Sequence, residues 1–189
     1  MKKINEIIYF GKLIEKYHLI SSHGGNISVK INDIILITET GSMLGQLKPE
    51  NIIPVSLKIA NDSSIKKASM EFVVHRAIYE SCNANAIIHT HPEYSIMLSF
   101  FYDKIEPIDS EGKYSVNEIP VISAKNTIAS NEVANEIKKI TRNYNAAIVK
   151  SHGLFVWAEN LEKAFYFTTS IEKSSKILYL NKQWIRRKN

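Results

Sequence analysis

The sequence contains a single cysteine and no long uninterrupted run of apolar residues. Cys82 cannot form a disulfide within the chain, so a reducing, cytoplasmic location is expected. No stretch approaches the roughly 20 apolar residues that a membrane-spanning helix needs, so no membrane association is predicted. Charged residues interrupt the stretch after Met1, which argues against a secretion signal and favours an amphipathic opening helix to about residue 18.

Nucleic-acid-binding motifs are also lacking, although the formal net charge is +5. The lysines are dispersed, and their densest cluster, residues 182–188, is predicted to be a solvated terminus. We therefore expect no nucleic-acid partner. An excess of positive charge would instead suit an enzyme that attracts phosphorylated substrates. With 189 residues and no internal repeat, the chain 1–189 is predicted to form a single domain.

Hydrophobic periodicity and turn signals predict alternating helices and strands. Helices are expected to about residue 18 and at 70–82, 131–142 and 161–180, with a short one opening at Pro92. Strands are expected at 26–30, 34–37, 52–57, 105–108, 119–122, 146–149 and 154–157, with a further strand that carries His89, and residues 60–64 are expected to form a surface turn. Hairpin-type strands mixed with helices favour an α/β sandwich whose sheet is mixed and largely antiparallel.

Two histidines stand at the end of an apolar run, in Ile87-Ile88-His89-Thr90-His91-Pro92. Because side chains alternate along a strand, His89 and His91 point to the same face and can bind one ion. A third histidine, His152, ends a second apolar run and is followed by Gly153. Three such ligands without an obvious fourth indicate a catalytic zinc site, although imidazoles also suit cobalt, iron or manganese.

Glu71 lies in the first turn of the helix expected at 70–82. One interpretation is structural: Ser69 caps the helix and the carboxylate favours its positive end. The other is chemical: Glu71 is the general acid/base that a bound metal ion cannot replace. Spacing alone leaves both open. His75, one turn further along, is expected to orient this helix or its neighbours rather than to bind metal.

Two glycine-containing loops flank predicted strands, at residues 23–26 and 38–42. Successive backbone N–H groups in such loops can form a concave anion-binding site. Either loop taken alone is typical of an ordinary turn.

Together these segments resemble the class II aldolase/adducin family, and within it the fuculose-phosphate aldolases. The resemblance runs from about residue 24 to the last helix, as a series of blocks whose order and spacing match. The blocks are Gly24-Gly25-Asn26-Ile27-Ser28, Thr40-Gly41, Leu44-Gly45, Ser69 to Glu71 with His75, His89-Thr90-His91, Ser151-His152-Gly153 and Asn160-Leu161-Glu162-Lys163-Ala164.

The resemblance implies a three-layer αβα sandwich around the mixed sheet, and a homotetramer with active sites at subunit interfaces. It implies one zinc ion per subunit, held by His89, His91 and His152, and Glu71 as acid/base. It also implies a substrate phosphate pocket formed by Asn26, Thr40, Gly41 and Ser69. The reaction implied is reversible cleavage of a ketose 1-phosphate, with L-fuculose 1-phosphate as the leading candidate, to dihydroxyacetone phosphate and a small aldehyde.

The chain departs from the family pattern at several positions. Met70 stands where these aldolases often have a second phosphate-binding serine, and Ser151 where asparagine is frequent. Trp157-Ala158 replaces a glycine turn. Glu111 resembles a glutamate that related aldolases contribute from the adjacent subunit, where it would protonate the aldehyde oxygen. A surface glutamate is an equal interpretation of this position.

Three alternative functions remain open. The family's epimerases carry an aspartate at the position of Glu71, which argues against that activity here. A methylthioribulose-1-phosphate dehydratase shares both zinc and the glutamate, so the reaction product has to distinguish it from an aldolase. A non-catalytic adducin-like module lacks the metal ligands, all of which are present in this chain.

Overall fold

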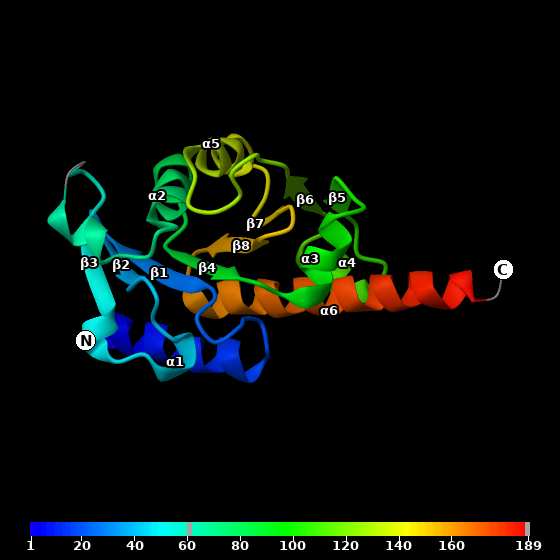
Figure 1. Cartoon of the computed structure of the whole chain (residues 1–189), viewed down its shortest axis with the longest axis horizontal. Coiled ribbons are helices and arrows are strands. Elements are labelled where there is room, and N and C mark those ends of the chain that lie inside the picture. The colour runs from blue at the N-terminus through cyan, green and yellow to red at the C-terminus, as the bar shows by residue number, and fades with distance from the viewer. Residues whose placement is uncertain (60–61, 188–189) are drawn as a thin grey trace.

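The structure, a computed structural model, describes residues 1–59 and 62–187. In this part of the chain eight strands form one sheet, in the order β3-β2-β1-β4-β8-β7-β6-β5 (Figure 1). The strands are β1 (Asn26–Ile31), β2 (Ile34–Thr38), β3 (Ile52–Ser56), β4 (Ala86–Thr90), β5 (Lys104–Ile105), β6 (Ile119–Ile122), β7 (Ala146–Val149) and β8 (Gly153–Ala158). Only β6 and β7 pair in parallel among these strands, and the other neighbours are antiparallel. The predicted mixed, largely antiparallel sheet is therefore confirmed.

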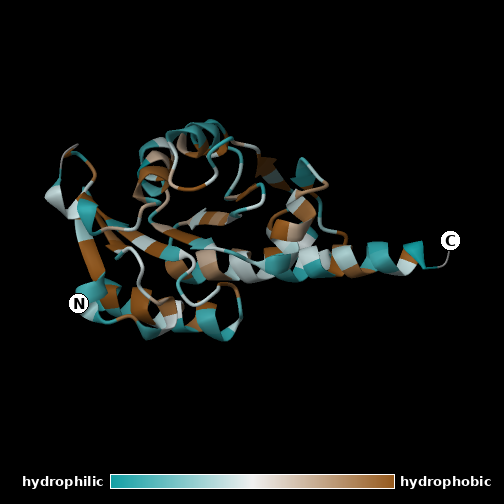
Figure 2. Ribbon diagram, viewed as in Figure 1, coloured by the Kyte–Doolittle hydropathy of each residue, from teal (hydrophilic) through white to brown (hydrophobic). Residues whose placement is uncertain are grey.

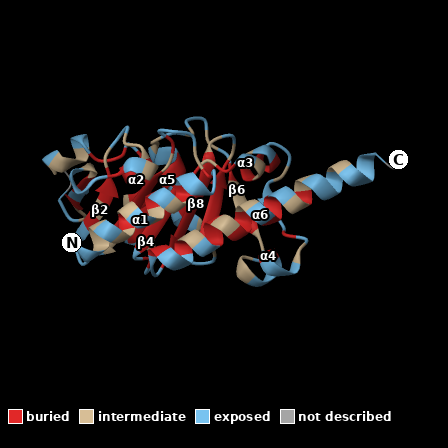
Figure 3. Ribbon diagram, turned by 90° about the horizontal axis from the view of Figure 1, so that it is seen from below, coloured by how far each residue is buried: buried red, intermediate tan, exposed pale blue. Residues whose placement is uncertain are grey.

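Helices cover both faces of the sheet. They are α1 (Lys2–Lys16), α2 (Phe72–Ser81), α3 (Glu93–Ser99), α4 (Ser110–Ser115), α5 (Asn131–Ile140) and α6 (Leu161–Arg186), with short 3₁₀ turns at Leu44–Gln46, Pro49–Asn51 and Ser63–Lys66. None of the helices described is both long and apolar enough to cross a bilayer. In Figure 1 the strands lie between α1 and α6 on one side and α2 and α5 on the other, and Figure 3 colours the strands behind α1 and α6 mostly as buried.

Side chains of successive strand residues point to opposite faces of the sheet, so a hydrophobic core forms on each face. In β4, Ile88 packs with residues of α1 and α6 on one face, while Ile87 packs with residues of α2 and α5 on the other. Hydrophobic segments accordingly run through the central strands in Figure 2. Burying both faces requires helices on both sides, which is why strands this apolar produce three layers. The predicted αβα sandwich is confirmed.

Strand register places three chain segments at one end of the sheet. Asn26, at the start of β1, pairs with His89 near the end of β4, and His89 pairs on its other side with Phe155 of β8. The start of β1, the end of β4 and the start of β8 therefore meet at one edge. Segments more than 60 residues apart in the sequence are brought together there.

Some predicted boundaries were wrong. The strand expected at 105–108 is Lys104–Ile105 and ends before Pro107, whose missing N–H cannot extend a ladder. The last helix continues to Arg186 instead of ending near residue 180, because no helix-breaking residue follows that point. Its C-terminal part extends past the sheet (Figures 1 and 3). Residues 60–61 of the predicted turn at 60–64, and Lys188 of the basic terminus, lie outside the described residues.

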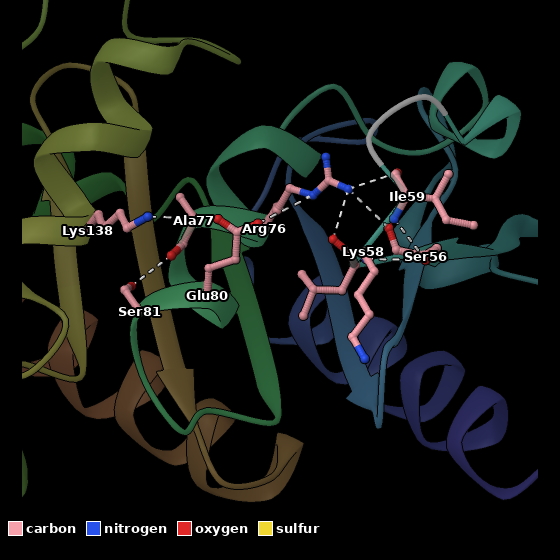
Figure 4. Close-up of polar contacts among 9 residues, drawn as sticks. Ser56, Lys58, Ile59, Arg76, Ala77, Glu80, Ser81 and Lys138 are labelled. Carbon is pink, nitrogen blue, oxygen red and sulfur yellow. Dashed lines mark hydrogen bonds and ion pairs between the residues drawn. The ribbon is translucent and has the colours of Figure 1, made fainter.

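Arg76 of α2 joins this helix to the end of β3 (Figure 4). Its Nη2 donates to the carbonyl oxygens of Ser56, Leu57 and Ile59, at 3.2, 3.1 and 3.1 Å. The guanidinium also lies 5.2 Å from the centroid of the Phe72 ring. One side chain thus holds the chain that leaves the sheet against the helix that follows Glu71.

Arg76→Met keeps most of the aliphatic stem and removes these hydrogen bonds. We expect the free energy of unfolding to fall by about 1–2 kcal/mol, since bonds from a charged donor are lost and the carbonyl groups are partly desolvated. Urea unfolding followed by circular dichroism measures this, with the exposed Arg142→Met as the matched control. Equal midpoints for the two variants would show that the Arg76 contacts contribute nothing to stability.

Candidate active site

His89, His91 and His152 lie together at the sheet edge where β1, β4 and β8 meet. His89 is in β4, His91 follows the end of that strand, and His152 is in the turn between β7 and β8. One nitrogen of each ring can be chosen so that all three lie within 4.8 Å of one another. His89 Nε2 and His91 Nε2 are 3.1 Å apart.

The ring nitrogens fit a metal ion. His89 Nδ1 lies 3.1 Å from the Leu154 carbonyl oxygen, to which it must donate, so Nε2 of the neutral ring carries a lone pair. His152 Nδ1 is buried and has no hydrogen-bond partner among the described residues. Around a tetrahedral ion with Zn–N bonds near 2.0–2.1 Å, ligand nitrogens are separated by about 3.4 Å. The observed spacing is compatible with shared ligation, and Leu154 orients the first ligand.

The surroundings keep these imidazoles neutral, as metal ligation requires. Burial, reinforced by the neighbouring rings of His91 and His152, lowers the pKa of His89 well below its usual value. Burial, followed by the effect of His152, lowers the pKa of His91 to about 4. Burial also lowers the pKa of His152.

Two glycines allow the histidines to approach so closely. A Cβ atom at Gly153 would lie 2.5 Å from the Thr90 carbonyl oxygen and 2.7 Å from His91 Cδ2. A Cβ atom at Gly24 would lie 2.8 Å from His91 Nδ1. Neither position has room for a side chain, so both glycines are required by the packing of the site.

The residue before His152 has a left-handed backbone conformation. Ser151 has φ 64°, and the His152 N–H donates to the Val149 carbonyl at 3.0 Å to close the turn. Asparagine, the residue that the family resemblance suggested at this position, tolerates this conformation better than most residues. The serine is held by the Ser99 hydroxyl, which accepts from its N–H at 3.1 Å.

A buried layer supports the metal-binding face. The ring of Phe155 stacks on His89, with centroids 3.9 Å apart and planes 16° apart. His75 lies edge-on to the same phenyl ring and bonds through Nδ1 to the Ser28 hydroxyl at 2.7 Å. His75 is thus a buried packing residue linked to β1 and lies outside the group of three ring nitrogens.

Glu71 lies directly before α2 and only 5% of it is exposed. Its Oε1 accepts the Ala129 N–H at 2.9 Å and lies 3.7 Å from His152 Nε2. Its Oε2 is buried without a hydrogen-bond partner in the described part of the chain. Burial raises the pKa of this carboxyl to about 7, against the opposing effect of the Ala129 bond. A carboxyl group that titrates near neutrality and has one free oxygen suits proton transfer.

The residues expected to bind phosphate line the same pocket as the histidines and Glu71. Asn26, Thr40, Gly41 and Ser69 surround this cavity of about 200 Å³. The 38–42 loop is joined to the segment before α2, since Thr40 Oγ1 accepts the Met70 N–H at 3.0 Å. The Ser69 hydroxyl accepts the Glu71 N–H at 3.3 Å, while the Glu71 side chain makes no helix-capping bond.

The segment 123–130 was missed by sequence reasoning. Ile128 lines the pocket and Ala129 supplies the N–H that binds Glu71. Ala129 has φ 49°, which its residue type does not signal. His23 and Glu39 also line the cavity and were not singled out individually.

Glu111 lies outside this pocket. It is exposed on the short helix α4 and forms an ion pair with Lys173 of α6 at 2.9 Å. A role for Glu111 across a subunit interface stays a prediction.

An αβα sandwich with three histidines and a buried carboxyl group at one sheet edge forms a candidate metal-dependent active site. Residues 5–179 match the family model described as Class II Aldolase and Adducin N-terminal domain. The chain belongs to this family, as the sequence blocks indicated.

Individual relatives agree with the family assignment. An L-fuculose phosphate aldolase of Methanocaldococcus jannaschii is 35% identical over 172 residues, covering 90% of this chain and 91% of the relative. The crystal structure of l-fuculose-1-phosphate aldolase from Thermus thermophilus superimposes with a TM-score of 0.88 at 31% identity, covering 94% of this chain and 93% of that one. A probable bifunctional methylthioribulose-1-phosphate dehydratase/enolase-phosphatase E1 of Ricinus communis is 25% identical over 175 residues, covering 75% of this chain and 32% of that protein.

Proposed function

We propose that the protein is a zinc-dependent aldolase that reversibly cleaves a ketose 1-phosphate to dihydroxyacetone phosphate and a small aldehyde. The leading substrate is L-fuculose 1-phosphate, which is supported by the names of the archaeal and bacterial relatives. The observation that carries the proposal is the placement of Glu71 against His152, beside three ring nitrogens within 4.8 Å of one another.

In the proposed reaction the three histidines bind the metal ion and Glu71 transfers the proton. A divalent ion held by His89, His91 and His152 would supply positive charge to stabilise the negative charge that develops on the substrate oxygens. In the condensation direction, Glu71 Oε2 takes the proton from the carbon of dihydroxyacetone phosphate, and the electron pair left behind forms the carbon–carbon bond. In cleavage, the same oxygen returns that proton.

The phosphate group is assigned to the loops around Asn26, Thr40, Gly41 and Ser69. Their side-chain and backbone donors can orient it without a metal contact. Met70 lines this pocket and is 66% exposed, and its side chain has no hydrogen-bond donor, so the phosphate site has one hydroxyl fewer than it would with serine there.

The proposal includes a cytoplasmic homotetramer of single-domain chains, with active sites at the subunit interfaces. Glu111 would then reach the aldehyde oxygen of a neighbouring subunit and protonate it. Within one chain the Glu111 carboxylate forms an ion pair with Lys173. This role therefore requires that the ion pair breaks, or that it lies beside the active site of the neighbouring subunit.

A product assay tests the function. Purified protein supplied with zinc should convert L-fuculose 1-phosphate to dihydroxyacetone phosphate, detected with a coupled dehydrogenase, in amounts equal to the aldehyde formed. Methylthioribulose 1-phosphate and ribulose phosphates are tested as substrates in the same assay. Loss of water without carbon–carbon cleavage would favour the dehydratase, the second candidate, which the Ricinus communis relative supports. No turnover of any phosphate with zinc, cobalt or manganese would contradict an enzymatic role.

A further inference from the structure

The turn between β6 and α5 reaches across the sheet edge to Glu71. Its Ala129 N–H donates to Glu71 Oε1 at 2.9 Å. This amide is the only hydrogen-bond donor to the Glu71 carboxylate within the described residues, and it leaves Oε2 free. The orientation of the proposed proton-transfer group therefore depends on where this turn holds one backbone N–H.

Ala129 adopts a conformation that its own sequence does not favour. Its φ of 49° is in the left-handed region, which is unfavourable for a non-glycine residue. Such a conformation persists only where surrounding contacts hold it. The contacts that hold this turn are consequently part of what positions Glu71.

Two side chains from the start of α5 hold the turn. Glu132 Oε2 accepts the N–H groups of Lys125 and Asn126, at 3.0 and 3.3 Å. The Ser130 hydroxyl donates to the Asn126 carbonyl at 2.6 Å and accepts the Val133 N–H at 3.1 Å. The far end of the turn is thereby tied to the first turn of the helix, and Ala129 is enclosed between the two attachments.

We propose that Glu132 is a positioning residue, which holds the 125–130 turn so that the Ala129 N–H fixes Glu71 Oε1 and leaves Oε2 facing the substrate. Glu132 does not touch the metal ligands or line the pocket in the described part of the chain, and it acts through the backbone of the turn. This inference rests on the proposed function, because it assigns Glu132 a part in the proton transfer by Glu71.

The hydrogen bonds of Glu132 allow two variants to be compared, one that can keep these bonds and one that loses them. A single oxygen of Glu132 accepts both amides, so Glu132→Gln can retain both bonds, whereas Glu132→Leu loses both. Glu136→Leu, one turn further along α5, is the matched control because that glutamate pairs with exposed Lys139. With zinc-loaded protein, we expect Glu132→Leu to lower kcat about tenfold or more with little change in KM, since a small misplacement of a reacting group costs this much. Glu132→Gln should restore kcat, and Glu136→Leu should not change it.

Amide hydrogen exchange gives a readout that does not depend on activity. The Ala129 amide should exchange faster in Glu132→Leu than in the wild-type protein, Glu132→Gln or Glu136→Leu. Unchanged protection of this amide would overturn the inference, as would wild-type kcat in Glu132→Leu or equal loss in Glu132→Gln. Inactivity of the wild-type protein on every sugar phosphate would instead contradict the proposed function, and exchange at Ala129 would still decide whether Glu132 holds the turn.

Discussion

Replacing Glu71 by glutamine is expected to lower kcat by ~10²–10⁴, the usual loss when a general acid/base is removed. The substitution preserves the size of the side chain, and its amide oxygen can still accept the Ala129 N–H. An amide cannot take and return the substrate proton, so proton transfer is lost while the position of the side chain is kept. Steady-state kinetics on L-fuculose 1-phosphate measures the change.

Measuring the zinc content of Glu71→Gln distinguishes a loss of proton transfer from a loss of the metal site. Glu71→Gln should bind as much zinc as the wild-type protein, because the three ring nitrogens are unchanged. Glu159→Gln, a surface substitution, provides the control for purification and assay. Wild-type turnover in Glu71→Gln would remove Glu71 from the proposed mechanism, whereas loss of zinc would reassign it to the metal site.

His91→Ala is expected to abolish detectable turnover together with metal binding. The variant leaves two ring nitrogens, and zinc sites in enzymes generally need three protein ligands. Because altering even a residue that only orients a ligand costs about 10–100-fold in metal affinity, losing the ligand itself should cost at least this factor. Isothermal titration with zinc measures the affinity directly.

A matched histidine variant controls for non-specific effects. His18 is exposed and has φ 55°, so His18→Asn preserves its backbone preference. It should bind zinc and turn over substrate as the wild-type protein does. If His91→Ala kept wild-type zinc affinity, the ion would have to lie elsewhere.

Sequence patterns predicted the parts of the site that depend on local geometry. The spacing of His89 and His91 suffices to place both rings on one face, because the period of a strand is two residues. The apolar runs before His89 and His152 predict that both histidines lie at strand ends. That His152 joins them was predicted from its matching position after an apolar run, and the family resemblance implied the same set. The pairing of β4 with β8 that brings them together could not be derived locally, because strand order is set by long-range packing.

The environment of Glu71 was less predictable. Its position before a helix follows from local signals, and these support a capping role as readily as a chemical one. Its burial and raised pKa come from segments distant in the sequence, and its one bond among the described residues is to the Ala129 backbone. A backbone donor leaves no trace in residue type, so the segment 123–130 could not be found from the sequence.

At the chain's periphery, one predicted boundary was wrong and one predicted role stays untested. The last helix continues past residue 180 because its apolar and charged residues remain compatible with a helix even where it leaves the sheet. Glu111 was assigned by a loose match of one short segment, and within one chain its carboxylate is paired with Lys173. Only an assembly could place it beside a neighbouring pocket.

The most direct test is a zinc titration of metal-depleted wild-type protein, with dihydroxyacetone phosphate formation followed in the same samples. If the three histidines hold the ion that supports cleavage, activity should rise in proportion to bound zinc and reach its maximum at one ion per chain. Full activity in the metal-free protein, or zinc binding without any cleavage of sugar phosphates, would contradict this account.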